Sequence, residues 1–321
     1  MKLIHEGKVK RVYQDPDSED RVIIDFTDTV TAGDGAKREE FPGKGKLACD
    51  ISYILLGFLE GKGIDTHLVK RLDDSKMLCQ KANIIPVEVV CRNIAAGSFC
   101  RRYGVNKGER LAAPLVEFFL KDDSLGDPLI TARAAESLSI ASGDDLQFME
   151  SVTLSANHYL SALLSQVGLD LVDFKLEFGR TSDGHMVIAD EISPDTMRIW
   201  DTKAKSLDKD VFREDKGDLL QVYTEFYERI REASGENVQT RPEVVEVIVE
   251  PKGGIKNPPG EVTKKALIRL GFAEVLEVRV GKVFRIRLQG PLTSEVLKQL
   301  KIMSVKLLSN PISEKYHVRL N

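Results

Sequence analysis

The chain has 321 residues, of which 42% are apolar and 30% charged, and its 46 lysines and arginines nearly balance its 50 aspartates and glutamates. This composition fits a globular protein of two or three domains and excludes a disordered chain, collagen and a disulfide scaffold. The net charge of −4 hides an asymmetry, because residues 241–321 hold 15 basic and 8 acidic side chains, whereas residues 1–240 hold 31 and 42. We therefore expect two bodies of opposite charge in one chain.

The sequence argues against a membrane, a nucleic acid and a metal–thiolate centre. No apolar run approaches the ~18 residues of a membrane span, and no apolar signal segment follows the first residues, so we expect a cytoplasmic protein. The basic residues of 241–321 are scattered singly among apolar ones, without the aromatic pattern typical of nucleic-acid binding. The four cysteines lack C-x-x-C spacing, which predicts buried free thiols.

Residues 1–235 combine short strands with longer helices. In chain order, hydrophobic periodicity predicts strands at 8–13 and 21–26, a helix at 47–59, strands at 66–71, 76–82 and 86–92, helices at 95–103 and 142–166, strands at 169–178 and 186–192, and a helix at 219–233. The strands come first and do not alternate strictly with helices, which predicts an α+β fold with antiparallel sheets.

A polar stretch at 233–242 is the clearest break in the chain. We place one domain at 1–235, a linker at 236–243 and a second domain at 244–321. The second domain is predicted to contain a strand at 244–249, a helix at 258–270, strands at 275–280 and 283–288 around a Gly281-Lys282 turn, a helix at 292–308 and a strand at 316–320. This βαββαβ order predicts a split-βαβ domain, and its small size favours a homo-oligomer.

One segment places three charged residues between apolar ones. In a strand, Asp173, Lys175 and Glu177 share one face, and the apolar residues between them share the other. If Asp183-Gly184 forms a two-residue hairpin turn, Glu177 lies directly opposite Asp190, with Cβ atoms about 5 Å apart. Two facing carboxylates need a compensating cation. The pair therefore predicts either a Mg²⁺ site or a solvated face that Lys175 neutralises.

The residues around this hairpin fit a site for an anionic substrate. Asp195 follows a Ser-Pro pair and is expected to cap a short helix or to face a substrate, with Arg198 projecting from the first turn of that helix. An arginine beside a carboxylate pair suits a substrate phosphate or carboxylate. Near the start of the chain, Lys8 and Lys10 share one strand face, which fits contacts to nucleotide phosphates or ordinary edge-strand lysines.

Two further segments do not look like scaffold. Gly33, Asp34 and Gly35 form a glycine-rich loop that fits a lid or an ordinary hairpin connection. At residues 90–98 a strand ends near Arg92 and a helix opens through Ala-Ala-Gly to Ser98, which fits a phosphate cradle or close helix packing. Neither a P-loop nor a Rossmann fingerprint is present, so any nucleotide site in this chain is expected to be neither of these two kinds.

Five of these segments together resemble the SAICAR synthetase (phosphoribosylaminoimidazole-succinocarboxamide synthase) family of purine biosynthesis. They are Gly-Lys-Val-Lys-Arg-Val-Tyr at 7–13, Ala-Gly-Asp-Gly at 32–35, Arg-Asn-Ile-Ala-Ala-Gly-Ser at 92–98, Leu-Val-Asp-Phe-Lys-Leu-Glu-Phe-Gly at 171–179 and Ala-Asp-Glu-Ile-Ser-Pro-Asp-Thr-Met-Arg-Ile-Trp-Asp at 189–201. Residues 244–320 resemble PurS, the small subunit of formylglycinamidine ribonucleotide synthetase, through Pro-Lys-Gly-Gly-Ile at 251–255, Val-Arg-Val-Gly-Lys at 278–282 and Lys-Leu-Leu-Ser-Asn-Pro at 306–311.

The resemblance implies a two-lobed domain with a kinase-like or ATP-grasp-like nucleotide site. It implies an ATP-dependent ligase that joins L-aspartate to carboxyaminoimidazole ribonucleotide and releases SAICAR, ADP and phosphate, with Mg²⁺ as cofactor. Carried over residue by residue, it implies ATP contacts by Lys8, Lys10, Lys81, Ala82, Ile84 and Lys121, substrate contacts by Gly33, Asp34, Gly35, Arg92, Ser98, Asp195 and Arg198, Mg²⁺ ligands in Glu177 and Asp190, and a catalytic set of Lys175, Glu177 and Asp190.

The PurS resemblance implies that the tail is a non-catalytic bridge between the large subunit PurL and the glutaminase PurQ. Two alternatives stay open at this point. The tail fits a small-molecule regulatory module that controls the ligase, and the first domain fits a small-molecule phosphotransferase, because such an enzyme needs the same lysines and Mg²⁺ ligands.

Overall fold

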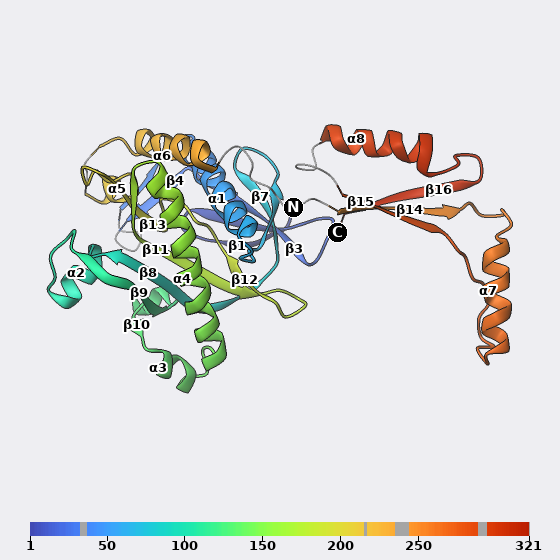
Figure 1. Cartoon of the computed structure of the whole chain (residues 1–321), viewed down its shortest axis with the longest axis horizontal. Coiled ribbons are helices and arrows are strands. Elements are labelled where there is room, and N and C mark those ends of the chain that lie inside the picture. Colours follow the sequence, from blue (N-terminus) through green and yellow to red (C-terminus); the bar gives the residue numbers. More distant parts are fainter. Residues whose placement is uncertain (33–36, 215–216, 235–243, 288–293, 321) are drawn as a thin grey trace. The chain divides into compact units, whose positions relative to one another are not determined.

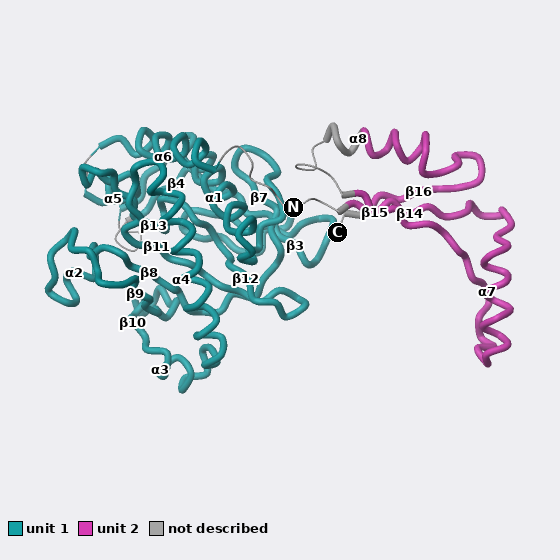
Figure 2. Tube along the Cα trace, in the orientation of Figure 1, with its two compact units in different colours: residues 1–239 teal, residues 240–321 magenta. Residues whose placement is uncertain are grey.

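Every ladder between named strands is antiparallel in the part of the chain that the structure describes, in agreement with the α+β prediction. The computed structural model describes residues 1–32, 37–214, 217–234, 244–287 and 294–320 (Figure 1). Contacts between Cα atoms divide the chain into two units, residues 1–239 and residues 240–321 (Figure 2). The linker predicted at 236–243 lies outside the described residues.

Unit 1, residues 1–239, is built on two main sheets. Its strands are β1 Leu3–Glu6, β2 Lys10–Gln14, β3 Arg21–Phe26, β4 Thr29–Ala32, β5 Lys37–Glu40, β6 Leu68–Arg71, β7 Lys76–Gln80, β8 Asn83–Ile94, β9 Arg110–Leu120, β10 Leu129–Ile130, β11 Leu169–Arg180, β12 Met186–Ala189 and β13 Met197–Asp201. The first sheet has the order β1-β2-β3-β7-β6. The second has the order β10-β9-β8-β11-β12, with β13 also paired to β11, while β4 and β5 form a separate ribbon.

Helices join the two sheets through one hydrophobic core. The helices of unit 1 are α1 Lys44–Gly61, α2 Gly97–Tyr103, α3 Ala132–Ser137, α4 Gly143–Gln166, α5 Asp210–Arg213 and α6 Leu219–Ser234, with a 3₁₀ turn η1 at Asp123–Leu125. Helix α1 contacts β3, β6 and β7 of the first sheet, and α4 contacts β8, β9 and β11 of the second. Helices α1, α4 and α6 also contact one another (Figure 1). The core therefore runs without interruption from Ile24 in β3 to Phe174 in β11.

The sequence around α4 explains where this helix begins. The Ser142 hydroxyl accepts a hydrogen bond from the Asp145 amide at 3.1 Å and so satisfies one of the unpaired N–H groups of the first turn. The carboxylates of Asp144 and Asp145 lie in that turn, where the helix dipole favours negative charge.

Two short segments connect the sheets of unit 1. Strand β7 ends at Gln80 and β8 begins at Asn83, so Lys81 and Ala82 lead directly from the first sheet to the second. His67, just before β6, donates its amide to the Ile188 carbonyl of β12 at 2.8 Å, and its own carbonyl accepts from Gln80 of β7 at 2.7 Å. The junction between the sheets is thus fixed on two sides.

Strand β11 separates the core from the polar face that the sequence predicts. Phe174, Leu176 and Phe178 are at most 1% exposed and belong to the core. Asp173, Lys175 and Glu177 alternate with them on the opposite face, as strand geometry requires. The two-faced interpretation of this segment is confirmed.

Unit 2, residues 240–321, has a three-stranded sheet of order β15-β14-β16. Its elements are β14 Val244–Pro251, α7 Pro258–Arg269, β15 Lys282–Arg287, α8 Ser294–Met303, a π-helical turn η2 at Ser304–Leu308 and β16 Glu314–Leu320. Helix α7 extends away from this sheet, whereas α8 runs alongside it (Figure 1). Buried apolar side chains among the described residues are few: Val245, Val247 and Val249 of β14 and Leu300 of α8.

The strand predicted at 275–280 is wrong, and so is the two-residue hairpin at Gly281-Lys282. Residues 275–280 form no ladder, and β15 pairs with β14 instead, from Lys282 opposite Val249 onward. The Asn257 side chain gives the physical reason. Its oxygen caps α7 by accepting from the Gly260 amide at 2.8 Å, and its amide donates to the Val280 carbonyl at 2.9 Å. The chain before β15 therefore follows the start of α7.

Two absences hold over the described ranges. No helix there is both long and apolar enough to cross a bilayer. The cysteines are free: Cys49, Cys79 and Cys91 are buried, as predicted, while Cys100 is half-buried.

Candidate active site

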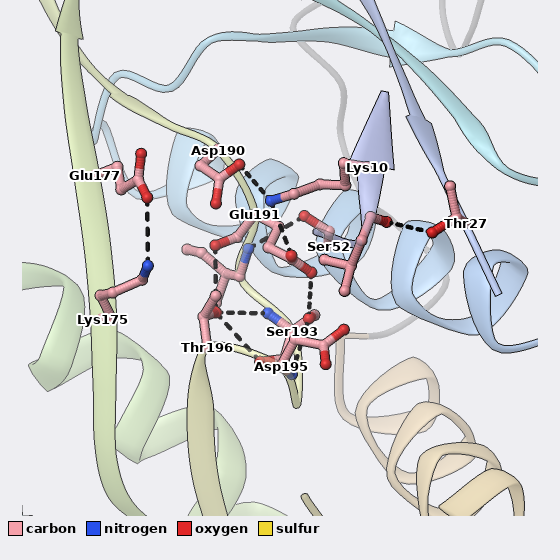
Figure 3. A network of polar contacts seen from close by, with 12 residues as sticks. Lys10, Thr27, Ser52, Lys175, Glu177, Asp190, Glu191, Ser193, Asp195 and Thr196 are labelled. Atoms are coloured by element: carbon pink, nitrogen blue, oxygen red, sulfur yellow. Dashed lines mark hydrogen bonds and ion pairs between the residues drawn. The ribbon is translucent and has the colours of Figure 1, made fainter. Parts of the chain in front are cut away.

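Charged side chains converge where the two sheets of unit 1 meet. They come from the start of β2, the polar face of β11, the residues after β12 and the turn before β13 (Figure 3). The polar face of β8 contributes Glu88 and Arg92. Most of them are largely buried, so each charge needs a partner of opposite sign. The ion pairs below show how this requirement is met.

The structure brings Glu177 and Asp190 into one cluster but not in the predicted register. Glu177 pairs with Ala189, not with Asp190. The connection between β11 and β12 has five residues, closed by a hydrogen bond from the Thr181 amide to the His185 carbonyl at 3.0 Å, so the two-residue turn at Asp183-Gly184 does not form. This difference in turn length shifts the pairing by one residue.

A left-handed backbone returns Asp190 to the site. A regular continuation of β12 would point its side chain to the face opposite Glu177, because successive residues of a strand alternate. Asp190 instead has φ of 65°, a conformation that costs a non-glycine residue about 1 kcal/mol or more. Its carboxylate then meets the Lys10 ammonium (Figure 3). Lys10, Lys175 and the more distant Lys121 lower the pKa of Asp190, although burial alone would raise it.

Lys10 lies between two acids. Its ammonium pairs with the carboxylate of Asp190 and, at 2.9 Å, with that of Glu191. Burial opposes its charge, but these two carboxylates outweigh burial and raise the pKa of Lys10. Glu191 also accepts a hydrogen bond from the Ser193 hydroxyl. Lys10 is therefore a permanently charged group held on the carboxylate segment.

A second cation lies across from it on β11. The Lys175 ammonium contacts Glu88 at 2.5 Å and Glu177 at 3.3 Å. Glu88 of β8 lies directly opposite Glu177, so two acids face each other across the ladder and Lys175 compensates both. Lys121, just after β9, also contacts Glu177. Burial opposes the charge of Lys175, but Glu177 and Glu88 raise its pKa, so it stays protonated.

The Asp190 segment is tethered from three sides. His67 donates from Nε2 to the Asp190 carbonyl at 2.9 Å. The Ile192 amide donates to the Ser52 hydroxyl of α1 at 3.2 Å, and the Thr196 hydroxyl donates to the Glu191 carbonyl at 3.3 Å (Figure 3). Burial lowers the pKa of His67 to about 4 despite the nearby Asp190, so the imidazole is neutral at physiological pH.

Arginines line a cavity of about 230 Å³ beside this cluster. Its walls are Val90, Arg92, Lys175, Asp195, Thr196, Met197, Arg198 and Arg213. Arg92 is buried between Glu117, at 2.6 Å, and Asp173, at 2.9 Å. Arg198 contacts the same Asp173 at 2.9 Å. The two predicted phosphate-binding arginines are therefore locked side by side through a shared carboxylate.

Arg198 comes from a strand, which corrects the predicted short helix. Residues 193–196 form a turn, closed by a hydrogen bond from the Thr196 amide to the Ser193 carbonyl at 2.9 Å, and β13 begins at Met197. Arg198 lies opposite Asp173 of β11. Burial opposes the charge of Arg198, but Asp173 and Asp210 raise its pKa. Sheet pairing of Met-Arg-Ile-Trp with β11 outweighs the helix-start signal of Ser-Pro-Asp.

Gly97 allows Arg198 to approach α2. It has φ of +56°, and a Cβ atom placed there would lie 2.7 Å from an Arg198 guanidinium nitrogen. Ser98 follows it and is exposed. The close approach of Arg198 to α2 thus depends on a residue without a side chain at position 97.

Asp195 lines the cavity, and side chains from other parts of unit 1 hold its carboxylate in place. Its carboxylate is 3% exposed and pairs with Lys44 at the start of α1 and, at 3.4 Å, with Lys209. The Tyr223 hydroxyl of α6 donates to it at 3.3 Å. Burial raises its pKa, but Lys44 and Lys209 outweigh burial and bring the pKa of Asp195 to about 2. The predicted capping of a helix by Asp195 is wrong, because no helix follows.

The predicted nucleotide contacts lie around the junction of the sheets. Lys8 precedes β2 and pairs with Asp123 of η1 at 2.9 Å. Lys81 and Ala82 form the connection to β8, and Ile84 follows with 43% exposure. Gly179 of β11 lies beneath them, because a Cβ there would be 2.8 Å from the Cβ of Ala82. Gly33, Asp34 and Gly35 lie outside the described residues.

Several polar and charged residues of this cluster were not predicted from the sequence: Lys44, His67, Glu88, Glu117, Glu191, Lys209, Asp210 and Arg213. Glu88 and Glu191 carried a weak signal, since Glu88 lies within an apolar strand and Glu191 follows shortly after one. The others belong to no motif, and only long-range contacts bring them to the site.

Comparisons with known proteins match both units. Residues 3–230 match the family model of SAICAR synthetase, and residues 244–321 match that of PurS, phosphoribosylformylglycinamidine (FGAM) synthase. Curated phosphoribosylaminoimidazole-succinocarboxamide synthases are similar: that of Lactococcus lactis subsp. cremoris (strain SK11) is 45% identical over 70% of this chain and 94% of its own length, and that of Staphylococcus aureus (strain JH9) is 43% identical over 72% and 99%.

Solved structures are also similar to this chain. A SAICAR synthetase (Type-2) in complex with ADP is 44% identical with a TM-score of 0.69, covering 72% of this chain and 98% of its own. The phosphoribosylaminoimidazole-succinocarboxamide synthase of Ehrlichia chaffeensis is 37% identical with a TM-score of 0.70, over 72% and 98%. The chain therefore belongs to the SAICAR synthetase family of ligases, and its C-terminal residues match the PurS family.

Proposed function

We propose that unit 1 joins L-aspartate to carboxyaminoimidazole ribonucleotide at the expense of ATP and gives SAICAR, ADP and phosphate. The observation that carries this proposal is the cavity lined by Arg92, Lys175, Arg198 and Arg213 next to the Glu177–Asp190 cluster. A phosphorylated, carboxylated substrate suits this basic cavity, and a nucleotide suits the adjacent lysines. Similarity to an ADP-bound SAICAR synthetase supports the same assignment.

The reaction proceeds by activation of a carboxylate. A carboxylate oxygen of the ribonucleotide attacks the γ-phosphorus of ATP, and ADP leaves. The amine of aspartate then attacks the acyl carbon, phosphate leaves, and the nitrogen loses a proton. The site must exclude water while the acyl phosphate exists. Burial of Arg92, Asp173 and Glu177, each at most 5% exposed, supports a site closed to water on this side.

In this proposal the arginines and Lys175 bind the ribonucleotide and orient it. Arg92 and Arg198, fixed by Asp173, hold the ribonucleotide phosphate with the Ser98 hydroxyl. Lys175 faces the imidazole carboxylate as a cation. It does not act as a base, because Glu177 and Glu88 hold its proton. Asp195, fixed by Lys44, closes the substrate side of the cavity.

The nucleotide is assigned to the junction of the sheets. Lys8, Lys10 and Lys121 supply positive charge for its phosphates, while Ala82 and the exposed Ile84 offer apolar surface beside the connection at Lys81. The loop at 33–35 is proposed to contact substrate.

The Glu177–Asp190 pair fits Mg²⁺. Both residues offer carboxylate oxygens, and both are engaged with ammonium groups, so the site favours cations. The described ranges hold no cluster of three or more metal-binding side chains, and Mg²⁺ beside a nucleotide needs only one or two carboxylates, with water and phosphate as its other ligands. When bound there, Mg²⁺ would neutralise the charge of the transferred phosphate.

The tail is proposed to dock the chain onto the PurL and PurQ subunits of formylglycinamidine ribonucleotide synthetase. Its match to PurS supports this. Its surface also supports a protein partner, since several large apolar side chains are at least 69% exposed: Val262, Leu270, Leu276, Leu307 and Ile312.

The first prediction separates a ligase from a phosphotransferase. The full chain should release ADP and form an amide only when ATP, the ribonucleotide and aspartate are all present. Coupled ADP detection, with chromatography of the product, measures both. Stoichiometric accumulation of a stable phosphorylated ribonucleotide without aspartate would favour the phosphotransferase.

The second prediction concerns the metal pair. Glu177→Gln should lower ATP turnover on the order of 100-fold or more, because the amide offers no charge to a metal, while the thermal unfolding midpoint changes little. Asp170→Asn is the matched control, since Asp170 lies on the same strand but pairs with Arg110 at an exposed position. Equal turnover by the two variants would contradict the assignment.

The third prediction tests the phosphate site through the two glycines at the ends of α2, Gly97 at its start and Gly104 just after it. Gly97→Ala and Gly104→Ala should each cost about 1–2 kcal/mol of unfolding free energy in urea, because both have positive φ. Only Gly97→Ala should also raise KM for the ribonucleotide, because a Cβ at position 104 meets no atom within 4 Å. Arg198→Ala should likewise raise KM for the ribonucleotide and leave KM for ATP unchanged. A parallel rise in KM for ATP would count against it.

The fourth prediction concerns the tail. A chain that ends at Gln239 should keep ligase activity but no longer co-purify with the synthetase and glutaminase subunits. Light scattering on both chains tests whether the tail also sets the oligomeric state. A regulatory module would give another result: an end product would change the ligase kinetics of the full chain and not of the shortened one.

A further inference from the structure

The backbone of Asp190 needs a specific support. Its φ of 65° is unusual for a residue with a side chain, and it interrupts the alternation of β12 directly after Ala189. Without that interruption, the Asp190 carboxylate would leave the face that Glu177 occupies. Whatever holds this peptide therefore decides whether the two carboxylates face the same space.

His67 is placed to provide the support. Its Nε2 lies 2.9 Å from the Asp190 carbonyl oxygen, which can only accept, so Nε2 carries the proton. The side chain is 4% exposed. Its own backbone is fixed to Ile188 of β12 at 2.8 Å and to Gln80 of β7 at 2.7 Å. The donor is thus anchored to both sheets before it reaches Asp190.

The hydrogen bond from His67 is made to the backbone carbonyl of Asp190, not to its carboxylate. The carboxylate of Asp190 pairs with Lys10 (Figure 3). The residues that follow have their own tethers to Ser52 and Thr196. Loss of the His67 hydrogen bond would therefore release the backbone at Asp190 and leave the neighbouring segment in place.

We propose that His67 is a positioning residue, whose Nε2–H holds the Asp190 peptide in the left-handed conformation that presents the carboxylate to a bound cation. The inference rests on the proposed function, in which Asp190 holds Mg²⁺. It assigns His67 no contact with substrate and no proton transfer.

The test compares two side chains of equal length at position 67. Gln can donate to the Asp190 carbonyl and Met cannot. Calorimetry measures ADP affinity with Mg²⁺ and with EDTA, and the ratio of the two is the metal enhancement. His67→Met should reduce this enhancement about tenfold or more, the effect usual for a residue that orients a metal ligand, and should leave metal-free ADP affinity nearly unchanged. His67→Gln should restore most of it.

Thr66→Val is the matched control. Thr66 is buried next to His67, but its hydroxyl donates to Glu60 at 2.8 Å and not to the site. This variant should lose stability while its metal enhancement stays at the wild-type value. If His67 only packs the junction, His67→Met and His67→Gln will lower the unfolding midpoint and leave the enhancement unchanged, and the proposal is then wrong. Equal loss of enhancement in both variants would also overturn it.

A double-mutant cycle separates this inference from the metal assignment. In an Asp190→Asn background, His67→Met should have no further effect on the enhancement, because both changes act through one group. If Asp190→Asn keeps the full enhancement, the metal assignment itself fails. If Asp190→Asn abolishes it while His67→Met does not, the metal assignment stands and the positioning role fails.

Discussion

Buried carboxylates can stay ionised only beside cations, and this constraint organises the junction between the two sheets. Glu88 and Glu177 face each other across β8 and β11, and Lys175 compensates both. Asp190 and Glu191 share Lys10 in the same way. Glu88 of β8 shares Lys175 with Glu177, which lies on the same strand as the lysine. Lys10 comes from β2, so these ion pairs join β8 to β11 and tie β2 of the first sheet to the second.

The same constraint fixes the positions of two arginines through Asp173. One carboxylate holds both Arg92 of β8 and Arg198 of β13, the two neighbours of β11. The guanidinium groups are kept together although their charges repel, an arrangement that supports the proposed anion site. Arg92 and Arg198 each have a second carboxylate partner, Glu117 and Asp210, so Asp173 is the counter-charge that they share and that sets their relative position.

Periodicity predicted the faces of the sheet but not the register. The alternation at 171–178 is strong enough to assign Lys175 and Glu177 to one face from sequence alone, and β11 confirms it. The position of Asp190 depends on the five-residue turn and on one φ angle, and the hydrophobic periodicity of the sequence reports neither of them. Glu177 and Asp190 lie in one cluster although the predicted register is wrong by one residue, and their role as a metal pair is a proposal.

Residues that reach the site only through long-range contacts could not be predicted from the sequence, for a different reason. His67 and Lys44 are single polar residues in segments with no motif, and only the fold brings them to Asp190 and Asp195. The missing strand at 275–280 is a similar case, because the Asn257 side chain redirects a segment whose own pattern favours a strand. Local patterns cannot report a competing partner far away in the chain.

The part of the tail that the structure describes buries few apolar side chains, whereas the site buries charged ones. β14 buries three valines, while Leu270, Leu276 and Leu307 stay at least 74% exposed. A domain of this size gains stability mainly by covering such side chains with another protein surface. Its excess of basic residues then favours an acidic partner surface through electrostatic complementarity, which speeds association. Fusion to the ligase adds a further effect, because every partner that covers the tail also brings an active site of unit 1 to the complex at high local concentration.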